Sequence, residues 1–175
     1  MSQQQQTQSL LRFGKYLLPQ QIMFWNKQHS YAILPLVQIT PGHIILVPKK
    51  QIKSFKDLST QELFDISLQI KFLTKYIETY FHASSSTVYM HNNDNKEEGQ
   101  IEQFFVHIIP RKAGDFEIND EIYLKISEFE QQFDIKYQSY FSPGKINQSI
   151  LDQYQDDAQK LSQYLSKQYK DEYIQ

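Results

Sequence analysis

The stretch Phe104-Phe105-Val106-His107-Ile108-Ile109 carries the strongest strand signal in the sequence, and Pro110 ends it. Neighbouring side chains in a strand point to opposite faces, so one face carries Gln103, Phe105, His107 and Ile109. A lone histidine on such a strand is more often a structural residue than a catalytic one. The strand alone therefore predicts a buried position in a sheet and leaves the role of His107 open.

Shorter strand signals precede this stretch. Residues 22–25 and 31–34 are apolar runs separated by Asn26-Lys27-Gln28-His29, which predicts a hairpin. Pro41-Gly42 is a turn signal, and the run 43–48 after it predicts a buried strand. Residues 84–90 predict a further strand, followed by a polar loop.

Two segments show helical periodicity. Ser59 and Glu62 form a capping box at the start of the first. The apolar stripe of this helix comprises Leu63, Ile66, Ile70, Leu73, Ile77 and Tyr80. Its opposite, solvent-facing side is expected to carry Gln69, Lys71, Lys75 and Glu78. The second helix, capped by Asn147 or Ser149, has an apolar stripe at Ile150, Tyr154, Ala158, Leu161, Leu165 and Tyr169.

Residues 117–146 mix aromatic and acidic residues and predict no clear element. The predicted fold is α+β: an antiparallel sheet with one long helix packed on it and a C-terminal helix. We expect a Gln-rich tail over residues 1–10, a core domain over 11–125, and a C-terminal extension over 126–175 packed on the same domain.

Composition excludes several classes of function. The 175 residues include no cysteine, which rules out disulfides and thiolate metal sites. A formal net charge of -2 argues against a nucleic-acid-binding protein. No apolar run is long enough to span a membrane, and the N-terminus lacks the pattern of a signal peptide. We therefore expect a cytoplasmic protein, with a nuclear or organelle-associated location left open.

Several short motifs, in order and at matching spacing, resemble the histidine triad family. The similarity is to its fragile-histidine-triad branch of dinucleoside polyphosphate hydrolases, with a degenerate triad. The matching motifs are Arg12-Phe13-Gly14, Ser30-Tyr31-Ala32, Pro41-Gly42-His43, Phe55-x-Asp57-Leu58, Gly99-Gln100, Pro110 to Phe116 and Asn119-Asp120-x-Ile122-Tyr123. Both arginines of the chain, Arg12 and Arg111, lie inside these motifs.

The resemblance implies three alternating histidines on the strand, the middle of which attacks the α-phosphorus and forms a covalent nucleotidyl intermediate. Anchored on Pro110, the three positions are Gln103, Phe105 and His107. Phenylalanine has no nitrogen lone pair, so no catalytic residue is assigned. A two-residue slip that would make His107 the nucleophile breaks the match from Pro110 to Phe116.

Other positions of the implied nucleotide site are partly kept. Pro35 stands where the family has an Asn or Asp that binds the ribose, and His91 replaces a glutamine that contacts phosphate. The residues left as candidates for nucleotide binding are His43, His91, Gly99, Gln100 and His107. His43, His91 and His107 are also a weak candidate for a metal-binding cluster, but no carboxylate accompanies them, so neither a metal nor a cofactor is predicted.

Three functions follow from this pattern. The first is a catalytically impaired pseudoenzyme that serves as a scaffold or subunit of a larger assembly with protein partners. The second is a pseudoenzyme that senses an adenine nucleotide or dinucleotide. The third is a residual dinucleoside polyphosphate hydrolase. The resemblance also implies a homodimer with a sheet continued across its two-fold axis.

Overall fold

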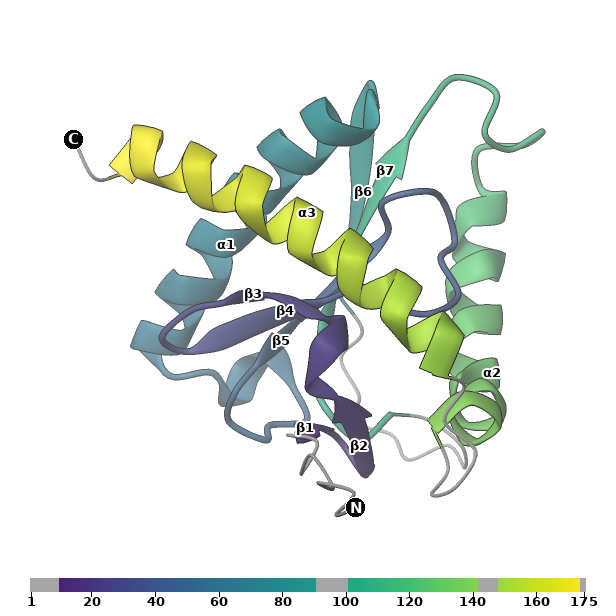
Figure 1. Ribbon diagram of the computed structural model, residues 1–175, viewed down its shortest axis with the longest axis horizontal. Helices are drawn as coiled ribbons and strands as arrows, with labels where there is room; N and C mark the ends of the chain where they lie inside the picture. The colour runs from purple at the N-terminus through teal and green to yellow at the C-terminus, as the bar shows by residue number, and fades with distance from the viewer. Residues whose placement is uncertain (1–9, 91–100, 142–147, 174–175) are drawn as a thin grey trace, which may run out of the picture.

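The computed structural model describes residues 10–90, 101–141 and 148–173 (Figure 1). An antiparallel five-stranded sheet has the order β3-β4-β5-β7-β6. Its strands are β3 (Met23–Asn26), β4 (Ser30–Ile33), β5 (Ile44–Pro48), β6 (Ser85–Met90) and β7 (Val106–Arg111). A separate hairpin pairs β1 (Leu10–Phe13) with β2 (Tyr16–Pro19). The predicted α+β class, the hairpin over residues 22–34 and the strand after Pro41-Gly42 are confirmed.

The strand that anchors the sequence prediction is shifted by two residues. β7 runs from Val106 to Arg111, whereas the pattern predicted 104–109. Phe104 instead precedes the strand, and its N–H donates to the carbonyl of Ile52 at 2.7 Å. Pro110 is tolerated inside β7 because pairing with β5 ends at Ile108, so that only β6 flanks the proline.

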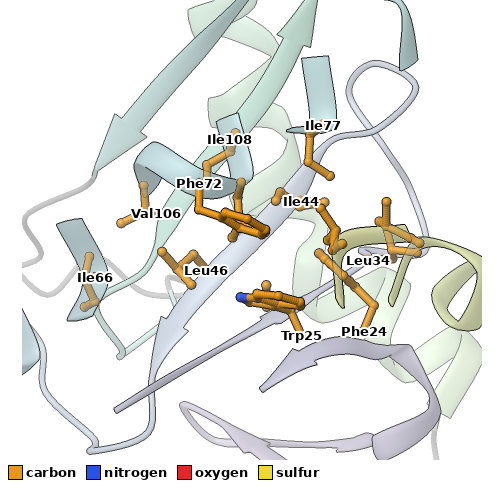
Figure 2. Packing of buried hydrophobic residues seen from close by; sticks show 14 of the residues in the cluster. Phe24, Trp25, Leu34, Ile44, Leu46, Ile66, Phe72, Ile77, Val106 and Ile108 are labelled. Atoms are coloured by element: carbon orange, nitrogen blue, oxygen red, sulfur yellow. The ribbon is translucent and has the colours of Figure 1, made fainter. Parts of the chain in front are cut away.

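One face of the sheet packs against two helices (Figures 1 and 2). Helix α1 (Thr60–Phe81) begins with the predicted capping box: the Ser59 hydroxyl accepts from the Glu62 N–H, and the Glu62 carboxylate accepts from the Ser59 N–H. Helix α3 (Gln148–Tyr173) lies across α1 and β3 and buries three residues of its predicted stripe. The shared core includes Ile44, Leu46, Ile66, Phe72, Ile77, Val106, Ile108, Ala158, Leu161 and Leu165.

The orientation of α1 differs from the prediction at both of its faces. Gln69, expected in solvent, is 1% exposed, and Leu63 and Tyr80, expected in the core, are 37% exposed. The Gln69 side-chain carbonyl accepts from the indole N–H of Trp25 at 2.8 Å, which satisfies two buried polar groups at once. This partner lies 44 positions away in sequence, so helical periodicity alone does not reveal it.

The opposite face of the sheet is covered by the β1–β2 hairpin and by helix α2 (Glu121–Phe141). This helix falls in the segment for which the sequence predicted no element. In Figure 1, α1 and α2 lie on opposite sides of the sheet. Both faces of the sheet are thus buried along β4, β5 and β7, whereas the edge strand β6 is partly exposed. None of the helices in residues 10–90, 101–141 and 148–173 is long and apolar enough to cross a membrane.

Candidate functional site

The face of β7 that carries His107 is continuous with Gln103 and Phe105, as the alternation predicted. All three side chains are at most 2% exposed. The Gln103 side chain is engaged at both ends: its carbonyl accepts from the Gly14 N–H at 2.9 Å, and its amide donates to the Pro48 carbonyl at 2.9 Å. Gln103 therefore ties the β1–β2 hairpin to the end of β5.

Phe105 occupies an aromatic layer. Its ring contacts Phe13 edge-on at 5.3 Å between centroids and His107 edge-on at 5.0 Å. These T-shaped contacts are the favoured geometry for aromatic pairs. The position that the resemblance assigns to the nucleophile is thus filled by a packed hydrocarbon ring.

His107 and His43 are fully buried and hydrogen-bonded to each other. His43 Nε2 lies 2.9 Å from His107 Nδ1, and His107 Nε2 lies 3.4 Å from a carboxylate oxygen of Glu130 on α2. The remaining nitrogen, His43 Nδ1, accepts from the Ile39 N–H at 3.3 Å. We call His43, His107 and Glu130 the buried triplet.

The backbone fixes the protons of the buried triplet. Because His43 Nδ1 accepts from a backbone N–H, the proton of neutral His43 is on Nε2 and is donated to His107 Nδ1. The proton of neutral His107 is then on Nε2 and is donated to Glu130. Burial, and secondarily the neighbouring His107, holds the pKa of His43 well below its ordinary value, so His43 is neutral at pH 7.

Helix α2 closes this face of the sheet. Phe129 stacks edge-on against both imidazoles, with centroids 5.2 Å from His43 and 5.5 Å from His107. Phe133 packs edge-on against Phe13 at 5.5 Å. With Glu130 on the same helix, α2 supplies both the apolar cover and the acceptor at the end of the buried triplet. Sequence reasoning missed Phe129 and Glu130, although the spacing of Ile122, Ile126, Phe129, Phe133 and Tyr137 is helical.

Little space remains beside Pro35, the position that resembles the ribose-binding residue. The cavity there has a volume of about 30 Å³. Its lining includes Leu18, Ile33, Pro35, Phe129, Phe133 and Tyr137. Pockets that bind drug-sized ligands enclose roughly 300–1,000 Å³. This cavity can hold a water molecule but no nucleoside.

Arg111, the last residue of β7, and the turn after it have a structural role. The Arg111 guanidinium forms two hydrogen bonds with the Asp115 carboxylate, at 2.7 and 3.0 Å, and reaches Thr87 and Asn119. The hydrogen bond from Arg111 lowers the pKa of Asp115, which keeps this carboxylate ionised. Arg111 thus holds the turn that follows it against β6.

The predicted binding residues are only partly brought together. His43 and His107 meet, whereas His91, Gly99 and Gln100 lie outside the described residues. Within the described part of the chain, no group of three or more His, Cys, Asp or Glu side chains is arranged to hold a metal ion.

Comparison with known proteins identifies the family. The profile described as HIT domain matches residues 19–114. The chain belongs to the HIT domain family. The bifunctional bis(5'-adenosyl)-triphosphatase/adenylylsulfatase FHIT of Arabidopsis thaliana is 33% identical to it over 161 residues, which is 91% of this chain and 85% of that protein. A bis(5'-adenosyl)-triphosphatase of Dictyostelium discoideum is 35% identical, over 66% of this chain and 77% of that protein.

Two solved structures are similar to this fold. The Plasmodium falciparum diadenosine triphosphate hydrolase has a TM-score of 0.56 and 26% identity, covering 75% of this chain and 92% of that one. The Caenorhabditis elegans NitFhit protein has a TM-score of 0.57 at the same identity, and the match spans only 31% of its longer chain. This HIT domain protein is therefore related to dinucleoside triphosphatases and to the NitFhit fusion.

Proposed function

We propose that this protein is a catalytically inactive HIT domain protein that serves as a scaffold or subunit of a larger protein assembly. The observation that carries the proposal is Phe105, which stands at the nucleophile position and is 2% exposed beneath α2. A fold kept intact around a pocket filled by its own side chains supports a role that depends on the surface of the protein.

The chemistry of the family requires an imidazole nitrogen with a free lone pair facing the α-phosphorus. The lone pair of His43 Nδ1 is occupied by the Ile39 N–H, and that of His107 Nδ1 by His43. Phe129 also packs edge-on against both rings, and both histidines are fully buried. Neither histidine can substitute for the missing nucleophile while α2 is in place.

The hydrolase test uses diadenosine triphosphate and measures AMP release. We expect release at the rate of a protein-free blank, with the Dictyostelium relative as the positive control. The double variant Gln103→His/Phe105→His restores the alternating histidines, and we expect it to remain inactive because α2 still covers the strand. AMP release by the unmodified protein would overturn the proposal and favour a residual hydrolase.

Nucleotide sensing through His43 and His107, together with His91, Gly99 and Gln100, is the alternative function, and it requires α2 to move first. A ligand that binds the native state raises the melting temperature with concentration. We expect no such rise with AMP, ATP or diadenosine triphosphate up to millimolar levels. A concentration-dependent rise that is lost in His107→Ala would replace the scaffold proposal with a nucleotide sensor.

Self-association through β6 is part of the same proposal. This strand lies at the edge of the sheet, where unpaired backbone groups can pair with a second copy. Val88 and Met90 on β6 are 38% and 41% exposed, and Tyr123 and Leu124 add exposed apolar surface at the start of α2. The homodimer implied by the resemblance would cover this surface.

Light scattering tests the dimer. We expect twice the monomer mass for the unmodified protein and a monomer for Val88→Lys/Met90→Lys, because lysines at an edge strand oppose strand pairing. Phe64→Lys is the matched control, since Phe64 is 72% exposed on α1, away from this edge, and it should leave the dimer unchanged. A monomeric unmodified protein would contradict self-association.

A further inference from the structure

The buried triplet places three polar side chains inside a largely apolar layer. Each comes from a different part of the fold: His43 precedes β5, His107 lies on β7 and Glu130 lies on α2. Of the three, only Glu130 belongs to α2, the helix that covers this face of the sheet. The contact between His107 and Glu130, 3.4 Å long, therefore joins α2 to the sheet by a polar link.

The closed arrangement has no room for another proton on either imidazole. A proton added to His43 Nδ1 would face the Ile39 N–H, and a proton added to His107 Nδ1 would face the proton on His43 Nε2. Either addition breaks a hydrogen bond in a fully buried place, where an unpaired polar group is costly. The docked state of α2 thus contains two neutral histidines.

Undocking of α2 removes this restriction. Without Phe129 and Glu130 above them, the imidazoles meet water and regain an ordinary pKa of about 6.5. The imidazoles of the undocked state then take up protons in mild acid, whereas those of the docked state do not. By linkage, acid favours whichever state binds more protons.

We propose that the buried triplet makes the docking of α2 sensitive to pH, so that α2 detaches from the sheet in mild acid while α1 and α3 stay packed. Detachment would expose the aromatic layer formed by Phe13, Phe105, Phe129 and Phe133. The inference goes beyond the scaffold role, because it concerns when this face of the protein is covered.

Besides the histidines, two titratable groups at this site are Glu130 on α2, beside His107, and Tyr89 on β6. Tyr89 on β6 lies 6.2 Å from His107 between ring centroids, and Tyr123 on α2 lies beside Tyr89. Burial, with Glu130 and Tyr123 as smaller causes, raises the pKa of Tyr89, so this phenol stays neutral in acid. Phe105 packs against His107, and Phe129 packs against both imidazoles, so these contacts are apolar.

The direction and size of the effect follow from proton counting. The group that resists protonation in the docked state is a histidine, so docking is strongest above pH 6.5 and weakens as the pH falls below it. Between pH 7.5 and pH 5.5 the equilibrium constant for undocking should rise about tenfold for each histidine that gains a proton.

The core that α1 and α3 form with the opposite face of the sheet should not loosen in mild acid. Among the described residues, no buried member of the cluster that joins α1 and α3 to the sheet is a histidine. Ile77 in this cluster and Ile126 on α2 are both at most 2% exposed. They offer a matched pair of positions, one in each half of the fold.

Thiol labelling of the full-length protein measures the two halves separately, because the chain has no cysteine of its own. Ile126→Cys and Ile77→Cys are labelled with the same reagent at pH 7.5 and pH 5.5, and the ratio of their rates cancels the pH dependence of the thiol. We expect this ratio to rise at least tenfold at pH 5.5. An unchanged ratio, with both sites either protected or equally exposed, overturns the proposal.

Repeating the labelling in proteins that carry further substitutions shows which residues bind the protons. Replacing the whole buried triplet, as His43→Leu/His107→Leu/Glu130→Leu, should remove the pH dependence of the ratio, while His82→Asn, at an exposed histidine, should leave it intact. If the triple variant does not fold, Glu130→Gln decides: its carbonyl can still accept from His107, so the tenfold rise should persist. A pH-independent ratio in Glu130→Gln, or a pH-dependent one in the triple variant, overturns the proposal.

The outcome is separable from the proposed function. AMP release by a protein whose labelling ratio still depends on pH would overturn the scaffold role and leave the behaviour of α2 standing. If the protein releases no AMP and its labelling ratio does not depend on pH, the pH-sensitive docking of α2 is overturned and the scaffold role stands.

Discussion

Replacing Phe129 with alanine is expected to lower the free energy of unfolding by about 3–5 kcal/mol, the usual cost of truncating a buried phenylalanine. Phe129 is 7% exposed and contacts His43, His107 and Phe133 through its ring. The variant removes the apolar cover of the buried triplet as well as its own packing. Urea denaturation followed by far-UV circular dichroism measures the change.

Phe64→Ala is the matched control for this substitution. Phe64 is 72% exposed on α1, so the same loss of atoms should change the free energy of unfolding by less than about 0.5 kcal/mol. Equal effects of the two substitutions would show that α2 is not packed as described. The same result would remove the structural basis for a filled pocket.

Replacing Gly42 with alanine is expected to destabilise the protein by about 2–5 kcal/mol, from the sum of a left-handed backbone and a collision. Gly42 has φ = +89°, and a Cβ added there would lie 2.5 Å from the ring of Phe81. Phe81 is the last residue of α1 and packs against the core, so the ring cannot simply turn away. Because Gly42 directly precedes His43, the collision also displaces the buried triplet.

Gly114→Ala separates the two contributions. Gly114 also has a positive φ, +77°, but no atom lies within 4 Å of the added Cβ. We therefore expect only the backbone cost of about 1–2 kcal/mol. Thermal unfolding of both variants at one protein concentration gives the comparison, and an equal loss in both would contradict the contact between Gly42 and Phe81.

The sheet and the start of α1 could be predicted from the sequence because their signals are local. The hairpin over residues 22–34, the turn at Gly42 and the capping box at Ser59 each depend on a few adjacent residues. The sequence predicts that Pro110 ends its strand, since a proline interrupts pairing in the middle of a sheet. It is accommodated because β5 is already too short to pair there, which only the three-dimensional arrangement shows.

The burial of Gln69 and the position of α2 depend on contacts between residues that are distant in sequence. Gln69 is polar, so the helical pattern predicts it in solvent, yet its hydrogen bond with Trp25 makes burial favourable. The acidic and aromatic residues of helix α2 obscure its helical periodicity. The side chains that face inward are those that pack against the sheet. Ile122, Ile126 and Phe129 on that inner face are all buried.

In the candidate site, too, some residues could be predicted from local sequence signals, whereas Glu130 could not. Alternation along one strand placed Phe105 and His107 on a common face, and the motif Pro41-Gly42-His43 brought His43 beside them. Glu130 had no signal of its own, because a carboxylate on a polar helix is normally solvated. Its pairing with His107 follows from the docking of α2, which the sequence did not predict.

The single tryptophan of the chain provides an intrinsic optical probe for half of the molecule. Trp25 stacks on Phe72 of α1 at 5.2 Å, meets Tyr169 of α3 edge-on at 5.6 Å, and has the Lys27 ammonium 4.1 Å above its ring. Its emission should therefore shift to longer wavelength when α3 leaves the sheet and remain unchanged when only α2 moves. Unfolding curves from fluorescence and from circular dichroism would therefore not coincide under conditions where α2 detaches while α1 and α3 stay packed.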